Sequence, residues 1–292
     1  MKEQNPERNE PITHQLGFVL SGGGARGFAH LGAIKALREI GLTPDCISGT
    51  SAGAFAGSLI ADGYSPEEVI SFFDNRVFKE FAKLMLPRSG IFSSVPFYHF
   101  LHKYLRAKSF GELKIPLSVT ATNLEKGKSV HFNEGLIIPP VVASCSVPVV
   151  FKPVKINNDH YVDGGVFKNF PVTPIRKQCR FVIGINVSPL LRRPYKENIW
   201  NIAEQSFHYM FISNTFADKK ACDLLIEIVP PEQNDYSMFD LTHTQEIYEL
   251  GYTRTLEIIK KNKNIIENII SWQSYYQRKE EKSNEKQRFL DQ

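Results

Sequence analysis

Ser51 is the residue of this sequence best suited to act as a nucleophile. It lies in Gly49-Thr50-Ser51-Ala52-Gly53, which follows a short apolar stretch and precedes an apolar run over residues 54–61. Small residues around a serine let a strand turn tightly into a helix, so that the hydroxyl projects at the end of a sheet above the helix N-terminus. The spacing predicts a nucleophile elbow, with Gly49 and Gly53 as its flanking glycines.

A glycine-rich stretch precedes the elbow, and two functions compete for it. Gly22-x-Gly24-x-x-Gly27 follows an apolar strand and opens a helix, as a dinucleotide-binding fingerprint does. That fold needs an acid at the C-terminal tip of its next strand, whereas here Asp45 stands at the strand's beginning. We therefore interpret the loop as an oxyanion hole, whose amides face a carbonyl attacked by Ser51. Its candidate residues are Gly22, Gly23, Gly24, Ala25, Arg26 and Gly27.

Composition narrows the class of protein. The chain has 292 residues, of which 42% are hydrophobic, enough to fill a sizeable core. A net charge of +4 from 35 basic and 31 acidic residues is too balanced for a nucleic-acid footprint. The four cysteines lie far apart without a C-x-x-C pair, which predicts neither a zinc site nor a disulfide framework. We expect reduced thiols, no metal and no cofactor.

Both ends of the chain are polar. Residues 1–15 lack the apolar segment of a signal peptide, and no stretch approaches the ~18 apolar residues of a membrane span. We expect a protein that is cytoplasmic or peripheral to the inner face of the membrane. The predicted division is a polar extension over 1–15, a catalytic domain over 16–270 and a charged C-terminal helix or tail over 271–292.

Strand and helix patterns alternate along the chain, which predicts an α/β fold. The predicted strands are Leu16–Leu20, a strand from about Asp45, Leu117–Thr122, Ser129–Phe132, His160–Val162, Phe181–Val187 and Leu224–Val229. Helices are predicted from Gly27 to about Ile40, after Gly53, from Ser65, within Pro139–Pro148, and over Ile199–Phe216 and Gln245–Lys261.

Four short blocks resemble one known family in their order and spacing. They are Gly22–Gly27, Gly49–Gly53, Ala143–Pro148, and Asp163-Gly164-Gly165 followed by Asn169-Phe170-Pro171. On these blocks the chain is similar to the patatin-like phospholipases, in their bacterial branch, from about Leu16 to Ile259. The resemblance implies a three-layer α/β/α fold with a central, mostly parallel sheet. It also implies hydrolysis of lipid acyl esters, such as phospholipids or lysophospholipids, by a Ser-Asp dyad.

In this resemblance Ser51 is the nucleophile, Asp163 is the base, and the first glycine block supplies the oxyanion donors. Gly164 and Gly165 form the turn after the base. Taken alone, Asp163-Gly164-Gly165 is better interpreted as a plain β-turn, and only the other blocks favour a catalytic aspartate. An aspartate has an ordinary pKa near 3.9, so a dry pocket must raise that pKa before the carboxylate can serve as a base.

Two alternatives to the dyad enzyme stay open. One is a Ser-His-Asp esterase, for which Ser51, Asp163 and then His208 or His243 stand in the right chain order. It is disfavoured because only one strand precedes the elbow strand. We expect His208 to be a surface or half-buried helix residue and His30 to belong to the first helix. Arg26 could steer an anionic head group or hold the glycine loop through a salt bridge, and we favour the structural role. The other alternative is a lipid-binding or scaffold protein of the same fold without turnover.

The stretch from Val69 to Leu105 is aromatic and interleaved with basic residues such as Lys79 and Lys83. An amphipathic helix in the core accounts for most of it. The alternative is a cap whose aromatic residues line an acyl-chain groove while its basic residues meet lipid phosphates. The pattern predicts no oligomeric state, head group or acyl-length preference.

Overall fold

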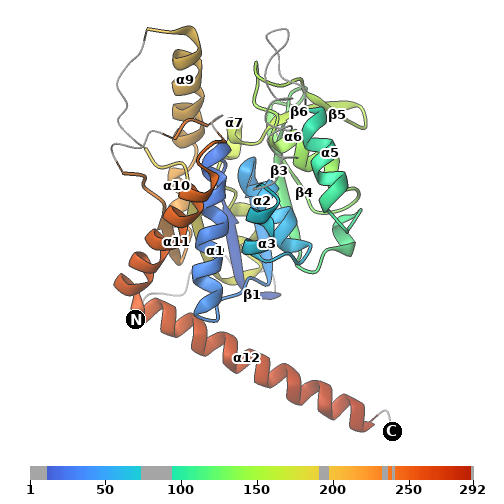
Figure 1. Ribbon diagram of the computed structural model, residues 1–292. Helices are drawn as coiled ribbons and strands as arrows, with labels where there is room; N and C mark the ends of the chain where they lie inside the picture. The colour runs from blue at the N-terminus through green and yellow to red at the C-terminus, as the bar shows by residue number, and fades with distance from the viewer. Residues whose placement is uncertain (1–11, 74–93, 191–196, 232–235, 239–240, 291–292) are drawn as a thin grey trace.

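The computed structural model describes residues 12–73, 94–190, 197–231, 236–238 and 241–290. One eight-stranded sheet occupies the centre, with helices on both faces (Figure 1). Its strand order is β5-β6-β3-β2-β1-β7-β8, and β4 also pairs with β3. Neighbours among β3, β2, β1, β7 and β8 are parallel, while β4, β5 and β6 pair antiparallel. The predicted α/β fold with a mostly parallel sheet is confirmed.

The strands are β1 His14–Leu20, β2 Cys46–Thr50, β3 Leu117–Asn123, β4 Lys128–Phe132, β5 Val154–Ile156, β6 Asp159–Asp163, β7 Cys179–Asn186 and β8 Leu224–Glu227. The helices are η1 Gly24–Gly27, α1 Phe28–Glu39, α2 Ala52–Ala61, α3 Pro66–Ser71, α5 Val95–Tyr104, η2 Phe110–Glu112, α6 Ile138–Ser144, α7 Gly165–Lys168, α8 Thr173–Arg176, α9 Ile199–Ser213, α10 Phe216–Lys220, α11 Thr244–Lys261 and α12 Lys263–Leu290.

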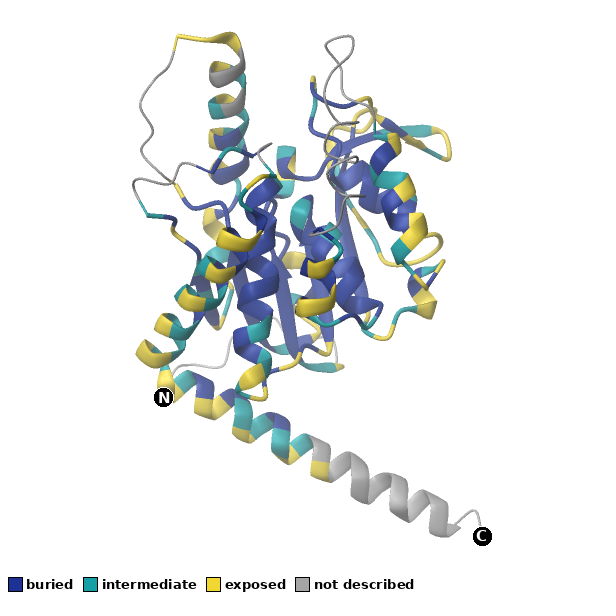
Figure 2. Cartoon of the chain, viewed as in Figure 1, coloured by how far each residue is buried: buried dark blue, intermediate teal, exposed yellow. Residues whose placement is uncertain are grey.

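Side chains of the central strand alternate between two cores, as the pleat of a strand requires. Leu16, Phe18 and Leu20 of β1 belong to the larger core, which α1, α2, α3 and α11 cover. Val19 points the other way, into a smaller core that includes Ile175 of α8. Buried residues accordingly fill the sheet and the inner faces of the flanking helices (Figure 2). The sheet is thus the middle layer of three.

The register on β3 brings the ends of two other strands together. Thr120 pairs with Thr50 of β2 and, on its other side, with β4. Ala121 pairs with Asp163 of β6 and, on its other side, again with β4. Because β4 occupies one edge of β3 at both positions, β2 and β6 share the opposite edge and meet there end to end. Ser51, directly after β2, therefore lies close to Asp163, the last residue of β6.

The aromatic stretch of 69–105 packs into the core where the structure describes it. Phe73 and Phe100 are buried, and their rings stack with centroids 5.1 Å apart. Leu101 of α5 is completely buried as well. The described part of this stretch therefore fits the core interpretation. Residues 74–93, which include Lys79 and Lys83, lie outside the described residues.

Candidate active site

Ser51 joins β2 to α2 in a tight turn, and its backbone is strained. Its φ is 53° and its ψ is −122°, a region that residues other than glycine rarely adopt. The two flanking glycines are needed because backbone passes close to both. A Cβ on Gly49 would lie 2.5 Å from the carbonyl oxygen of Gly53, and one on Gly53 would lie 2.2 Å from that of Leu20.

Asp163 is a buried carboxylic acid at the end of β6. Its backbone N–H donates to the carbonyl oxygen of Ser146 at 2.9 Å, and its Oδ1 accepts the N–H of Gly165 at 2.7 Å. Burial raises the pKa of Asp163 to about 7, although the Ser51 hydroxyl and the Gly165 amide both favour the ionised form. A carboxyl with this pKa can accept a proton near neutral pH.

The contact between Asp163 and Ser51 is close but not tight. Oδ2 of Asp163 has no partner within ordinary hydrogen-bond limits of length and angle. The Ser51 side chain nevertheless lies near enough to lower the pKa of this carboxyl. Candidate catalytic groups often come into tight hydrogen-bonding geometry only when substrate binds, so this arrangement is compatible with proton transfer between the two side chains.

The glycine loop offers two backbone amides next to the elbow. The N–H groups of Gly22, Ala25 and Arg26 donate to carbonyl oxygens of the protein at 2.8 to 3.3 Å. Among the described residues, the N–H groups of Gly23 and Gly24 donate to no protein acceptor. These two amides are therefore the candidate donors to an oxyanion.

Arg26 holds the loop from within, and its side chain is 3% exposed. Its Nε donates to the carbonyl oxygen of Gly23 at 3.3 Å, and its Nη2 donates to Nδ1 of His208 at 3.4 Å. Gly27, which ends η1, packs against Ala52 of the elbow helix, where a Cβ would lie 2.5 Å from that of Ala52. Arg26 thus contacts the glycine loop as expected, and the contact that the structure describes is a hydrogen bond to a carbonyl oxygen.

Three consecutive small residues at the end of α6 hold both members of the pair. Ser144 Oγ accepts the N–H of Ser51 at 2.7 Å and donates to the carbonyl oxygen of Thr120 at 2.6 Å. Cys145 Sγ donates to the carbonyl oxygen of Ser51 at 3.4 Å, and Ser146 accepts from Asp163 as described above. The sequence located this block but assigned no role to Ser144. The only signal was a run of small residues before a proline.

His30, His208 and His243 make contacts elsewhere. His30 lies in α1 as expected and donates from Nε2 to the carbonyl oxygen of Ser21 at 2.9 Å; burial lowers its pKa to about 4. His208 is 1% exposed, so the expectation of a surface or half-buried residue is wrong. His243, before α11, lies 3.2 Å from Oε2 of Glu246. Within the part of the chain that the structure describes, none of these histidines is hydrogen-bonded to Asp163.

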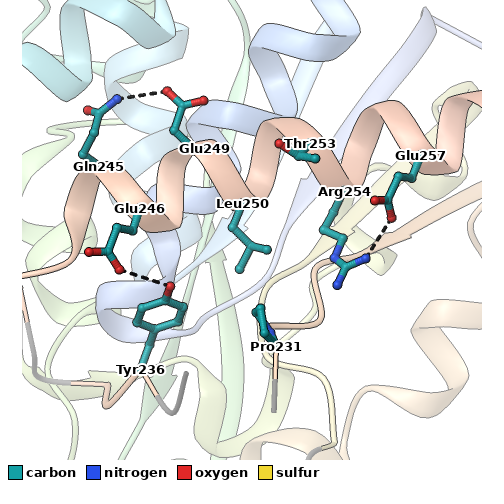
Figure 3. A pocket seen from close by; sticks show the side chains of 9 residues that line it. All are labelled: Pro231, Tyr236, Gln245, Glu246, Glu249, Leu250, Thr253, Arg254 and Glu257. Atoms are coloured by element: carbon teal, nitrogen blue, oxygen red, sulfur yellow. Dashed lines mark hydrogen bonds and ion pairs between the residues drawn. The ribbon is translucent and has the colours of Figure 1, made fainter. Parts of the chain in front are cut away.

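An open cavity of about 590 Å³ runs along α11 (Figure 3). It is lined by Pro231, Tyr236, Gln245, Glu246, Glu249, Leu250, Thr253, Arg254 and Glu257. Neither Ser51 nor Asp163 is among the residues that line this cavity. In the described ranges no three His, Cys, Asp or Glu side chains gather as metal ligands would, and no helix is long and apolar enough to span a bilayer.

Comparison with known proteins gives matches over most of the chain. The patatin-like phospholipase family matches residues 18–175. Lysophospholipase NTE1 of Kluyveromyces lactis is 28% identical over 81% of this chain but only 18% of its own length. The uncharacterised protein YqhO of Bacillus subtilis is 32% identical over 64% of this chain and 76% of its own. The crystal structure of VipD from Legionella pneumophila covers 85% of this chain and 67% of its own at 16% identity, with a TM-score of 0.47.

Proposed function

We propose that this chain, which belongs to the patatin-like phospholipase family, hydrolyses carboxylic ester bonds of lipids. The observation that carries the proposal is the strained Ser51 beside a buried Asp163 whose pKa is about 7. A serine hydroxyl becomes a useful nucleophile only when a neighbour accepts its proton. A carboxyl that titrates near neutral pH meets that requirement without a histidine.

Acylation begins when Ser51 Oγ attacks the ester carbonyl carbon and its proton passes to Asp163. The carbonyl oxygen becomes an oxyanion, for which the N–H groups of Gly23 and Gly24 are the donors. The N-terminus of α2 beneath Ser51 adds a favourable partial positive charge. Collapse of the tetrahedral intermediate breaks the ester C–O bond. The leaving alcohol takes the proton from Asp163, and the acyl group stays on Ser51.

Deacylation repeats these steps with water. Asp163 accepts a proton from the attacking water, whose oxygen bonds to the acyl carbon. The second tetrahedral intermediate collapses, Ser51 Oγ recovers a proton from Asp163, and the carboxylic acid departs. The same carboxyl thus serves as base and then as acid in each half-reaction, which suits a pKa near the working pH.

The substrate class that we propose is phospholipid or lysophospholipid. The name of the yeast relative, a lysophospholipase, supports it. Because each buried methylene contributes about 0.8 kcal/mol, hydrolysis should increase with acyl length when the chain is bound in an apolar groove. We also propose that the protein associates peripherally with a membrane. Equal cleavage of short and long esters, together with no binding to vesicles, would contradict both the lipid substrate and the membrane association.

The decisive test is labelling of purified protein with a fluorophosphonate, followed by analysis of products from a phospholipid and lysophospholipid panel. We expect wild type to be labelled on Ser51 and to release fatty acid, and Ser51→Ala to do neither while remaining folded. Failure of wild type to react would favour the non-catalytic lipid-binding alternative. Hydrolysis at the wild-type rate by Ser51→Ala would exclude Ser51 as the nucleophile.

A further inference from the structure

Asn169 is a polar residue beside the active site whose side chain has no partner. It is completely buried, and neither Oδ1 nor Nδ2 makes a hydrogen bond. Its main chain is well held: the N–H donates to Oδ1 of Asn214 at 2.8 Å, and the carbonyl oxygen accepts from Gly22 at 3.0 Å. Buried amides without partners cost stability and are uncommon in native proteins, so this one calls for a functional reason.

Two glycines of the active site leave room for this amide. A Cβ on Gly22 would lie 2.2 Å from Oδ1 of Asn169 and 3.2 Å from Cβ of Ser51. A Cβ on Gly165 would lie 3.0 Å from the same Oδ1 and 3.0 Å from Oδ1 of Asp163. The amide therefore lies among the glycine loop, the nucleophile and the turn that follows the acid, in space that any other residue at 22 would close.

We propose that Asn169 is a positioning residue for the catalytic pair, whose side-chain amide orients the Asp163 carboxyl toward Ser51. The proposal rests on the Ser-Asp mechanism proposed above. An amide group carries both a donor and an acceptor. Nδ2 can therefore donate to Asp163 when it is ionised, and Oδ1 can accept from it when it is protonated. One side chain thus serves both states through which the base passes in every half-reaction.

Packing alone does not explain an asparagine at this position. Its recorded hydrogen bonds are made by the main chain, which any residue other than proline at 169 would provide. Leucine has nearly the same shape and would remove two buried polar atoms without partners, a change that is neutral or stabilising where no function is lost. A structural role and a positioning role therefore predict opposite results for Asn169→Leu.

The other ionisable groups around Asp163 must be considered before a pH profile is interpreted. Cys145 directly follows α6. Burial and then the charge of Asp163 raise the pKa of its thiol well above the ordinary value, so the thiol stays neutral. Lys168 of α7 is paired with a carboxylate of α10 at 2.8 Å. Arg26 of η1 contacts His208 of α9.

The test compares Asn169→Leu and Asn169→Asp with Thr122→Val as a matched control. Thr122 also carries a buried oxygen without a partner. It pairs with Val162, the residue before Asp163, so its side chain lies on the opposite face of the sheet from that of Asp163. We expect Asn169→Leu to keep or raise the melting temperature and to lower kcat by at least about tenfold with little change in KM. Thr122→Val should leave kcat unchanged.

Asn169→Asp places a second carboxylate of the same shape next to the first. Like charges disfavour the ionised form, so the acid limb of the kcat/KM profile should move to higher pH by roughly one unit or more. Full kcat in Asn169→Leu, or an unmoved limb in Asn169→Asp, would overturn the inference.

Two further measurements separate this inference from the function on which it rests. Wild type and Ser51→Ala, assayed in parallel, test the Ser-Asp mechanism by themselves. Should wild type prove inactive, carboxyl ¹³C NMR of Asp163 still tests the contact. An upward shift of its titration midpoint in Asn169→Asp supports the positioning of Asp163 by residue 169, and an unchanged midpoint contradicts it.

Discussion

At the scale of single residues, the site depends on how its acid is buried. Asp163 has backbone hydrogen bonds at both its N–H and its Oδ1, but Oδ2 lacks the full set of donors that would stabilise a carboxylate. Desolvation therefore outweighs hydrogen bonding, and the pKa rises to about 7. The Asp163 carboxylate can therefore act as a base near neutral pH, because the fold stabilises its charged form less than water would.

Asp163→Asn should abolish turnover and also change how stability depends on pH. The folded-state pKa of about 7 lies above the unfolded value, so wild type loses stability as the pH rises toward 7. Asparagine does not ionise and avoids this loss. From pH 5 to pH 8 the variant should gain roughly 3 kcal/mol in free energy of unfolding relative to wild type. Urea denaturation at both pH values measures it, and parallel pH profiles for the two proteins would contradict the raised pKa.

Ser51→Gly should be more stable than Ser51→Ala by about 1 kcal/mol. Both variants lack the hydroxyl, but alanine keeps a Cβ at a φ of 53°, where glycine has no steric penalty. Thermal denaturation of the two inactive proteins compares them directly. Equal melting temperatures would mean that the elbow stores little strain.

At the scale of elements, the residues at the end of α6 hydrogen-bond the main chains of both Ser51 and Asp163, the proposed nucleophile and base. Ser144→Ala removes the acceptor of the Ser51 N–H and leaves that buried group unpaired. We expect the free energy of unfolding to fall by about 1–3 kcal/mol and kcat/KM to fall about tenfold or more.

The control for this variant is Ser58→Ala, on the elbow helix. Ser58 is also a buried serine, but its hydroxyl donates only to the carbonyl oxygen of Phe55 in its own helix. Its loss should cost less stability and little activity. Equal effects of the two substitutions on kcat/KM would contradict a positioning role for Ser144.

Much of the element pattern could be predicted from local sequence. The strand before the glycine loop, the elbow and the strands around the turn at 124–127 all follow from apolar runs bounded by small or polar residues. The helix predicted over 199–216 instead ends at Ser213. Asn214 directs its side chain to the carbonyl oxygen of Gly165 at 2.8 Å, a long-range contact that helix propensity does not reveal.

The rest of the site depends on tertiary contacts between distant segments. No local pattern indicates that β6 continues along the edge of β3 where β2 stops, nor that Ser144 accepts from Ser51. His208 is buried and contacts Arg26, which lies 182 residues earlier, so the sequence around His208 does not reveal its position. Asn169 belongs to one of the blocks that carry the family resemblance, but only the structure shows that its side-chain amide has no hydrogen-bond partner.

At the scale of the whole molecule, α12 docks on the body by its first half and then extends away from it (Figure 1). The predicted boundary at residue 270 falls inside this helix. Ile269 is completely buried, Trp272 Nε1 donates to Oε1 of Gln15 at 3.1 Å, and the Arg180 guanidinium lies 3.7 Å from the centre of the Trp272 ring. The first half of α12 is thus part of the folded domain.

Ile269→Ala should lower the free energy of unfolding by about 2–4 kcal/mol, because it opens a cavity in the main core. Removal of residues 277–292 should change it little, since the contacts of α12 with the body that the structure describes involve residues up to Gln273. Calorimetry of both variants tests the assignment. A large loss on truncation would extend the domain beyond the docked half.

The end-to-end arrangement of β2 and β6 along β3 divides the proposed active site between two parts of the chain. Ser51 precedes the turn at 124–127 and Asp163 follows it. That turn is exposed, and Gly127 at its tip has no atoms near the position of a Cβ. A chain cut there would carry the nucleophile on one fragment and the base on the other. Each fragment alone would then be inactive, and ester hydrolysis by a mixture of the two would show that the fragments reassemble into one active site.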